Sequence, residues 1–122
     1  MVRSGIPQKR AKKGIIPGDP FKTRAKTVHF LIKKFGHKFS KEQRTEMANL
    51  GKEILEVGDA DYLFLGKDPF ISGVAIFVYL TRRVYPYRPY AVTYGDIREE
   101  SAHFASGANF VKLLKDLKKR FG

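Results

Sequence analysis

The sequence predicts an all-α protein, a bundle of five helices that follows an extended basic arm. Along most of the chain, apolar residues recur at steps of three and four, which is the period of an amphipathic helix. Residues that cap helix starts precede several of these segments, and glycine or proline separates them. The 122 residues suffice for one modest core. We therefore expect an arm over residues 1–20 and a single helical domain over residues 21–122.

Composition separates the arm from the first helix. Residues 1–20 contain three prolines and three glycines, which prevent a regular helix. The first helix is expected from Phe21 to Phe35, before Gly36. The inward stripe of this helix is expected to consist of Phe21, Ala25, Val28, Ile32 and Phe35.

The second helix has signals at both of its ends. Ser40 and Gln43 have the spacing of a capping box, and Gly58 is expected to end the helix. The connector over residues 59–67 is expected to turn its apolar side chains inward. The inner face of the helix is expected to consist of Met47, Leu50, Gly51, Ile54 and Leu55. The inward side chains of the connector are expected to be Tyr62, Leu63, Phe64 and Leu65.

The third helix begins with Asp68 as its cap and Pro69 at its first position. It is expected to continue to Arg82 or Arg83 and is apolar on nearly every side. Such a helix forms the buried centre of a bundle. The β-branched residues leave a strand as the alternative, whereas the Asp-Pro start and the length of the segment favour a helix.

Two shorter helices follow an aromatic loop over residues 84–92, which Pro86 and Pro89 keep extended. The fourth helix begins at Thr93, with Asp96 completing a capping box, and is expected to run to Ser106. Its buried residues are expected to be Ile97, Ala102 and Phe104. The fifth helix is expected over Ala108 to Phe121, with a stripe of Phe110, Val111, Leu114, Leu117 and Phe121.

The charge is large and unevenly distributed. Of the net charge of +12, residues 1–41 hold +11, because they contain twelve bases and one acid. Residues 42–68 carry −4 and residues 69–122 carry +5. A clustered excess of this size indicates a polyanionic partner. A membrane surface is not expected as the partner, because it would favour an amphipathic basic helix with aromatic anchors and no folded domain behind it. The longest apolar run, residues 74–80, is also too short to span a bilayer.

No motif in the sequence indicates an enzyme, a metal or a cofactor. The chain has no cysteine, which excludes disulfides and cysteine-ligated zinc. Its histidines, His29, His37 and His103, have no ligand spacing on one helix face. The acids do not cluster as a metal-dependent nuclease requires. A cytoplasmic protein is expected, associated with the nucleoid or the ribosome or packed in a virion, and the scarcity of Asn and Gln is typical of thermophiles.

The order of helices, together with the segment KDPFISGVAIFVYLTRR, resembles one cyclin-like repeat of transcription factor IIB and its archaeal counterpart, transcription factor B. The resemblance implies a cyclin-like fold and contact with DNA through the fourth and fifth helices. The sequence contains one such repeat, whereas those factors carry two, and it lacks their zinc ribbon. The residues that match are Gly66, Lys67, Asp68, Pro69, Val74, Ala75, Tyr79, Leu80 and Arg82, then Thr93, Asp96 and Ile97, then the segment from Phe110 to Leu117.

These features predict a nucleic-acid-binding protein that holds duplex DNA by its phosphates in a transcription-factor-like, regulatory role, with RNA as the other nucleic acid considered. Helices four and five are expected to form a helix-turn-helix or, alternatively, an ordinary solvated face. The tyrosines of the loop either stack on bases or cover the end of the bundle. The candidate contacts are Arg3, Lys9, Arg10, Lys12, Lys13, Lys22, Arg24, Lys26, Lys33, Lys34, Lys38, Arg82, Arg83, Arg88, Asn109, Lys112 and Lys115.

Two other functions are compatible with the sequence. One is a structural nucleoprotein, either ribosome-associated or coating a viral genome, whose arm threads into RNA or between subunits. The other is a protein-binding adaptor, with the acidic stretch of residues 42–68 as the face that meets its partner.

Overall fold

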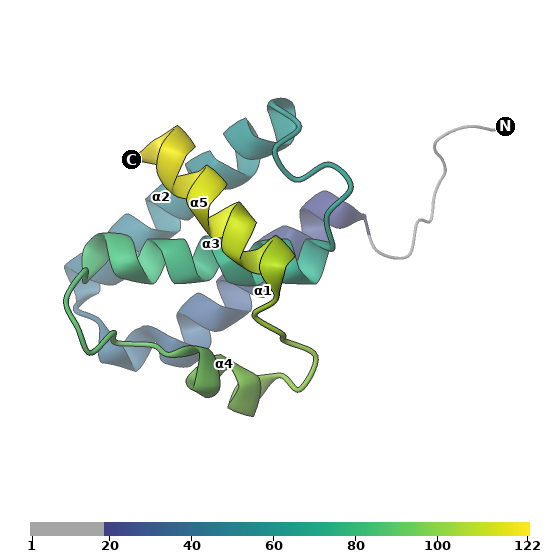
Figure 1. The fold of residues 1–122 in the computed structure, drawn as a ribbon. Helices are drawn as coiled ribbons and strands as arrows, with labels where there is room; N and C mark the ends of the chain where they lie inside the picture. The colour runs from purple at the N-terminus through teal and green to yellow at the C-terminus, as the bar shows by residue number, and fades with distance from the viewer. Residues whose placement is uncertain (1–18) are drawn as a thin grey trace, which may run out of the picture.

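The computed structural model describes residues 19–122, and all regular structure in that range is helical (Figure 1). The elements are α1 (Pro20–Phe35), a short 3-10 turn η1 (Gly36–Lys38), α2 (Lys41–Ala60), α3 (Pro69–Val84), α4 (Tyr94–Glu100) and α5 (Ala108–Phe121). The all-α prediction is confirmed, and the strand alternative for the third segment is wrong. The expected arm lies outside the described residues except for its last two positions.

The third helix is the centre of the bundle, as its apolar sequence predicts. Every residue from Ser72 to Thr81 is buried. Helices α1, α2 and α5 all pack against α3; α5 crosses in front of it in Figure 1, and α1 lies behind it. A helix with apolar residues on every side requires such cover, because any face left open would expose it to water.

The predicted helix starts are confirmed. The Ser40 hydroxyl accepts from the Gln43 N–H at 3.0 Å, and the Gln43 side chain accepts from the Ser40 N–H at 2.9 Å. Thr93 and Asp96 make the same reciprocal pair at 3.1 and 2.9 Å. The hydrogen bond from the Thr93 backbone lowers the pKa of Asp96, and the charge of Lys38 also lowers it. Each box satisfies N–H groups that a helix start leaves without partners.

The expected end of α2 at Gly58 is wrong, because the helix continues to Ala60. Gly58 is buried inside the helix, where the ring of Phe64 occupies the place of a side chain. A Cβ added there would stand 2.4 Å from Phe64 Cε2. The connector was also expected to bury four side chains, yet Tyr62 and Leu65 are each 74% exposed and Phe64 alone is fully buried.

Helix α4 ends at Glu100 rather than at Ser106. The chain from 101 to 107 is a loop, in which the expected core residue Ala102 is exposed. Phe104 is buried, and its ring packs edge-on against Tyr94 and Phe110 at centroid distances of 6.0 and 5.1 Å. This ring cluster holds the loop against the start of α5, although the loop itself is not helical.

The inward stripes of α1 and α5 are partly wrong. On α1 the buried row is Arg24, Val28, Leu31 and Phe35, whereas Phe21, Ala25 and Ile32 of the predicted stripe are half-buried. On α5 the buried row is Phe110, Leu113 and Leu117, and Val111 is 38% exposed. Both helices carry two adjacent apolar rows, and the spacing alone does not tell which row faces the core.

The close approach of α1 to α3 depends on Gly73. A Cβ at this position would stand 2.6 Å from Thr27 Cβ and 3.1 Å from the Arg24 carbonyl oxygen. We expect Gly73→Ala to lower the free energy of unfolding by about 1–3 kcal/mol, as overpacking does. Gly95→Ala is the matched control, because its Cβ would meet nothing closer than 3.6 Å. This substitution should stabilise α4 by up to about 1 kcal/mol. Urea denaturation measures both, and a Gly73→Ala variant as stable as the parent would contradict the packing.

Candidate nucleic-acid interface

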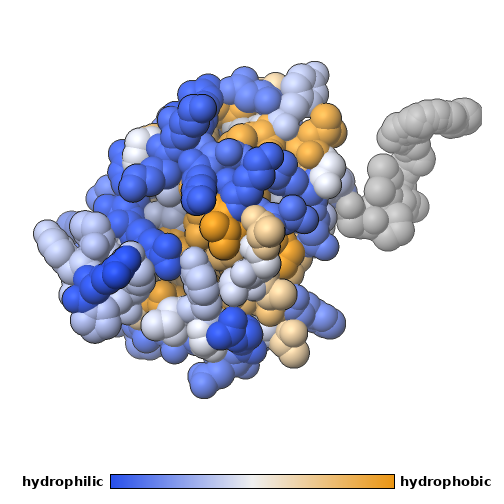
Figure 2. Space-filling view, viewed as in Figure 1, coloured by the Kyte–Doolittle hydropathy of each residue, from blue (hydrophilic) through white to orange (hydrophobic). Residues whose placement is uncertain are grey.

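A groove of about 590 Å³ runs between the C-terminal half of α3, the loop over residues 85–92 and α5. We call it the α3–α5 groove. Its lining includes four cationic side chains, and no acidic side chain within residues 19–122 lines it. The cations are Arg82, Arg83, Lys115 and Lys118. Hydrophilic side chains cover most of the face that carries α5, and hydrophobic side chains show near its centre and toward its upper right (Figure 2).

Arg82 lies between two tyrosine rings of this groove. Its guanidinium carbon is 4.1 Å from the centroid of the Tyr90 ring and 5.3 Å from that of Tyr94. These are cation–π distances, so the rings hold the guanidinium in place. Within the described part of the chain, the buried Nε of Arg82 has no hydrogen-bond partner. Because this nitrogen is buried, any contact with an anion in the groove would fall to the terminal nitrogens of the guanidinium.

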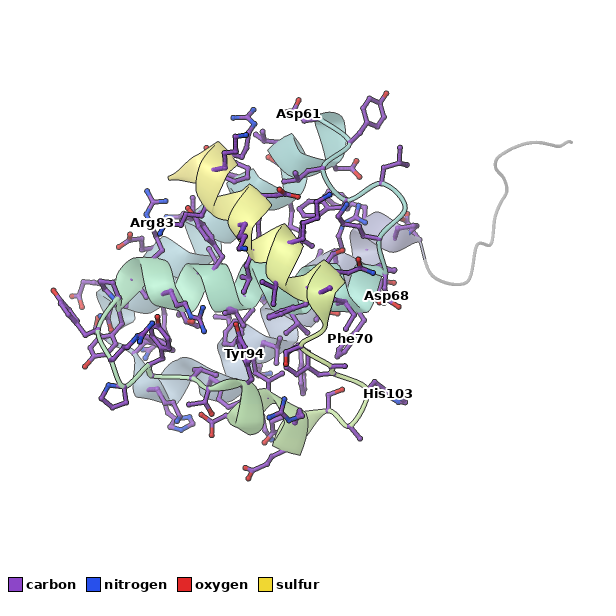
Figure 3. The ribbon with its side chains drawn as sticks, in the orientation of Figure 1. Asp61, Asp68, Phe70, Arg83, Tyr94 and His103 are labelled. Carbon is purple, nitrogen blue, oxygen red and sulfur yellow. The ribbon has the colours of Figure 1, made fainter. Side chains whose placement is uncertain are left out.

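Arg83 joins the ends of α3 and α5. Its Nη1 donates to the Tyr79 hydroxyl at 2.6 Å and to the Phe121 carbonyl at 3.0 Å. Tyr79 in turn donates to the Gly122 carbonyl at 3.2 Å. Figure 3 shows Arg83 beside the last turn of α5, with Tyr94 nearer the start of that helix. Arg83 thus carries positive charge to the edge of the groove while it caps the last carbonyl groups of α5.

The positive side chains around Tyr90 act on its hydroxyl. Arg88 Nε donates to Tyr90 Oη at 3.3 Å, and this hydrogen bond is the largest cause that lowers the pKa of Tyr90. The charges of Arg88, Arg82 and Lys118 lower it further, while desolvation opposes them. Three cations from separate segments therefore act at one point of the groove.

Helix α5 supplies the lysines of the groove. Lys115 and Lys118 are exposed, and neither makes an ion pair within residues 19–122. Lys118 was not among the predicted contacts, although it follows Lys115 by three residues and so lies on the same face of the helix. Asn109 and Lys112 are exposed on the first turns of α5 but do not line the groove.

The lysines of the first helix form a separate positive surface. Lys22, Lys26 and Lys33 are exposed on α1, which lies on the other side of α3 from α5 (Figure 1). Lys34 and Lys38 instead reach acids of α4, with Nζ to carboxylate distances of 3.4 and 3.6 Å. The predicted contacts Arg3, Lys9, Arg10, Lys12 and Lys13 lie outside the described residues.

The expectation that Arg24 contacts nucleic acid is contradicted by its burial. Arg24 is 4% exposed, and its Nη2 donates to Asp59 Oδ1 at 2.9 Å. Its guanidinium also lies 4.9 Å from the centroid of the Phe64 ring. Arg24 therefore ties α1 to the end of α2 and to the following connector. The sequence pattern missed this because a cation on an amphipathic helix is ordinarily solvated.

The structure does not place α4 and α5 as a helix-turn-helix. Their connection spans residues 101–107, whereas that motif uses a turn of about three or four residues. Helix α5 packs on α3, and α4 makes no extensive contact with α5. The tyrosines of the loop contact arginines and one another, since Tyr85 and Tyr87 pack edge to face at 5.3 Å. The two surfaces that the sequence treated separately, the loop and α5, instead form one groove.

Within the described range, His, Asp and Glu side chains do not gather into a group that would hold a metal ion. The helices in that range all lack the combination of length and hydrophobicity that a membrane span needs. Comparisons with known protein families, with curated proteins and with solved structures find no match to this chain.

The structural role of Arg24 is testable. We expect Arg24→Gln to lower the free energy of unfolding by about 2 kcal/mol, because it removes a hydrogen bond between charged groups. Lys22→Gln, at an exposed position of the same helix, should change stability by less than about 0.5 kcal/mol. Thermal and urea denaturation measure the difference. Equal stability of the two variants would contradict the structural role of Arg24 and would indicate that its side chain faces solvent.

The contact between Arg88 and Tyr90 can be tested by titration. We expect Arg88→Ala to raise the pKa of Tyr90, because the guanidinium hydrogen bond stabilises the phenolate. NMR titration of the labelled tyrosine ring carbon measures this pKa directly. Arg98→Ala is the control, since Arg98 is an exposed arginine of α4 that does not line the groove. A Tyr90 pKa that moves equally in both variants would contradict the contact.

Proposed function

We propose that this protein binds nucleic acid through the phosphate backbone, with the α3–α5 groove as the principal contact and duplex DNA as the preferred form. The observation that carries the proposal is the gathering of Arg82, Arg83, Lys115 and Lys118 in one groove, to which residues 19–122 contribute no acid. Phosphate contacts of Lys and Arg dominate the affinity of proteins for nucleic acids. The sequence alone predicted that the main positive surface lies in residues 1–41. The α3–α5 groove is a second positive surface, built from the C-terminal half of the chain.

Within the groove, the rings of Tyr90 and Tyr94 favour phosphate contact over base stacking. Stacking on a base requires a free ring face. Arg82 covers Tyr90, and Tyr94 packs edge-on against Phe104 and Phe110. Contact with phosphates does not require unpaired bases, so it can be made to a duplex. This supports a duplex as the ligand.

The remaining positive surfaces extend the proposed contact. Residues 1–18 carry five bases and no acid, and Lys22 is an exposed lysine of α1 that lies outside the lining of the groove between α1 and α2. Both would add affinity that does not depend on sequence. A regulatory, transcription-factor-like role rests on the resemblance of the third and fourth helix starts to the transcription factor IIB repeat.

The salt dependence of binding tests the proposal. Filter binding of duplex DNA, single-stranded DNA and structured RNA is measured from about 50 to 200 mM salt. We expect the duplex to bind most tightly, and Lys118→Gln to reduce the slope of log affinity against log salt by about 1. Lys119→Gln is the control on the same helix, because Lys119 does not line the groove.

Two results would contradict the proposal. One is a duplex affinity that does not change with salt, and the other is an equal effect of Lys118→Gln and Lys119→Gln. Preference for structured RNA, together with co-sedimentation with ribosomes, would favour a structural nucleoprotein instead. A deletion that tests the arm should stop before Asp19, since Asp19 caps α1 by accepting from the Phe21 N–H at 3.0 Å.

A further inference from the structure

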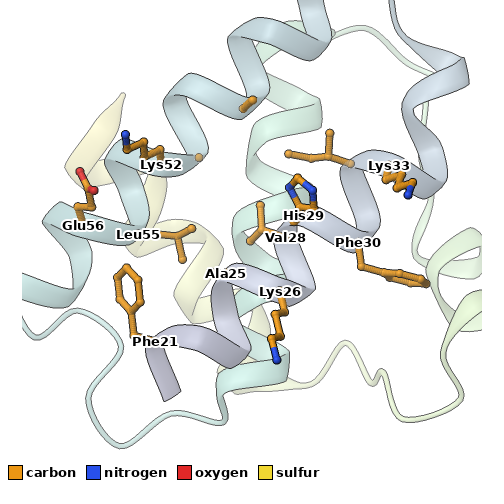
Figure 4. A pocket seen from close by; sticks show the side chains of 13 residues that line it. Phe21, Ala25, Lys26, Val28, His29, Phe30, Lys33, Lys52, Leu55 and Glu56 are labelled. Carbon is orange, nitrogen blue, oxygen red and sulfur yellow. The ribbon is translucent and has the colours of Figure 1, made fainter. Parts of the chain in front are cut away.

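A second groove, of about 720 Å³, lies between α1 and α2. We call it the α1–α2 groove (Figure 4). Its residues and those of the α3–α5 groove do not overlap. The half-buried row of α1 lines it, which explains why this helix carries more apolar residues than the contact with α3 uses. The α1–α2 groove is therefore a surface that the proposed function leaves unused.

The floor of the α1–α2 groove is apolar along its length. Helix α1 contributes Phe21, Ala25 and Ile32, of which the first and last are eleven positions apart, or about 16 Å along the helix. Helix α2 contributes Ala48 and Leu55 across from them, and Figure 4 shows Phe21 and Leu55 facing each other. This length matches about three turns of a helix laid along the groove.

The rim of the α1–α2 groove is positive. Lys26 and Lys33 lie on α1 and Lys52 on α2, whereas the described part of the chain contributes one acid to the lining, Glu56. Within residues 19–122 none of these four side chains makes an ion pair. An occupant with acids on both sides of an apolar row would therefore pair with this rim.

We propose that the α1–α2 groove docks an acidic amphipathic helix of a partner protein. The apolar row of such a helix would cover the floor, as in helix-in-groove recognition, and its flanking Asp or Glu residues would meet the lysines. The α2 side of this groove lies within residues 42–68, the stretch that the sequence suggested for a partner, but the groove offers that partner a positive rim instead of an acidic face. Because the two grooves share no residue, partner and nucleic acid can be held together.

The charges argue against the other occupants. Residues 1–18 carry five bases and no acid, so the lysine rim repels the protein's own arm. In a two-fold dimer the same patch of both subunits meets at the interface. A dimer through this face would therefore place two positive rims against each other, and they would repel. A nucleic acid would meet the rim but leave the apolar floor open to water.

A pair of synthetic peptides tests the proposal. Each is about three turns long, with leucines in one helical row, and they differ in carrying glutamates or lysines beside that row. Fluorescence anisotropy with the full chain measures the affinity of each labelled peptide. We expect the glutamate peptide to bind at least about tenfold more tightly than the lysine peptide, a difference of about 1.4 kcal/mol.

Variants of exposed residues connect this binding to the α1–α2 groove. Ala48 lines the groove yet is exposed, so Ala48→Glu should preserve the fold and weaken the glutamate peptide about tenfold. Ala60→Glu, at the exposed end of the same helix, should leave its affinity within about twofold. Lys52→Glu should weaken the glutamate peptide and strengthen the lysine peptide, whereas Lys41→Glu, outside the groove, should do neither. Circular dichroism checks that each variant is folded.

Three outcomes would overturn the proposal. They are equal binding of the two peptides, an Ala48→Glu variant that binds like the parent, and self-association in sedimentation that Ala48→Glu abolishes. The last would assign the α1–α2 groove to a second copy of the chain. Ala48→Glu should leave duplex affinity unchanged, so this test and the test of the α3–α5 groove fail independently.

Discussion

The burial of α3 on every side is the constraint on which the rest of the structure depends. Ten consecutive residues of this helix are buried, so α1, α2 and α5 must cover it together. At two positions a glycine allows a covering helix to pack closely against α3. Gly73 lets α1 approach α3, and a Cβ at Gly51 would stand 3.2 Å from Leu80 Cδ1. The positions of the three outer helices follow from this one central surface.

The α3–α5 groove forms where the burial of α3 ends. Thr81 is the last buried residue of the helix, and Arg82 and Arg83 follow at the edge of the core. At that edge α5 and the aromatic loop come together, so their cations and tyrosines join the arginines. The end of a hydrophobic helix thus becomes a positive groove, because charged side chains stay at the border with water.

Helix α1 shows how one element serves two surfaces. Its buried row packs into the bundle, while Phe21, Ala25 and Ile32 line the α1–α2 groove. Positive charge therefore borders apolar surface on one side of α3 and tyrosine rings on the other. We expect this difference to separate a protein partner from a nucleic acid, because one surface offers area to bury and the other offers donors to phosphates.

The sequence by itself determined the helices, their capped starts, the central place of α3 and the positive character of the chain. These features are local or compositional: a capping box such as Thr93 and Asp96, an apolar run or a net charge is complete within a short segment. Only the tertiary structure decided which apolar row of α1 and α5 faces inward, because spacing leaves two adjacent rows equivalent. It also decided that Arg24 is buried beside Asp59 and Phe64, 35 and 40 residues away in the chain, and that Arg82 and Lys118 line the same groove. Such contacts join distant segments, and their physical cause is the way the helices pack around α3.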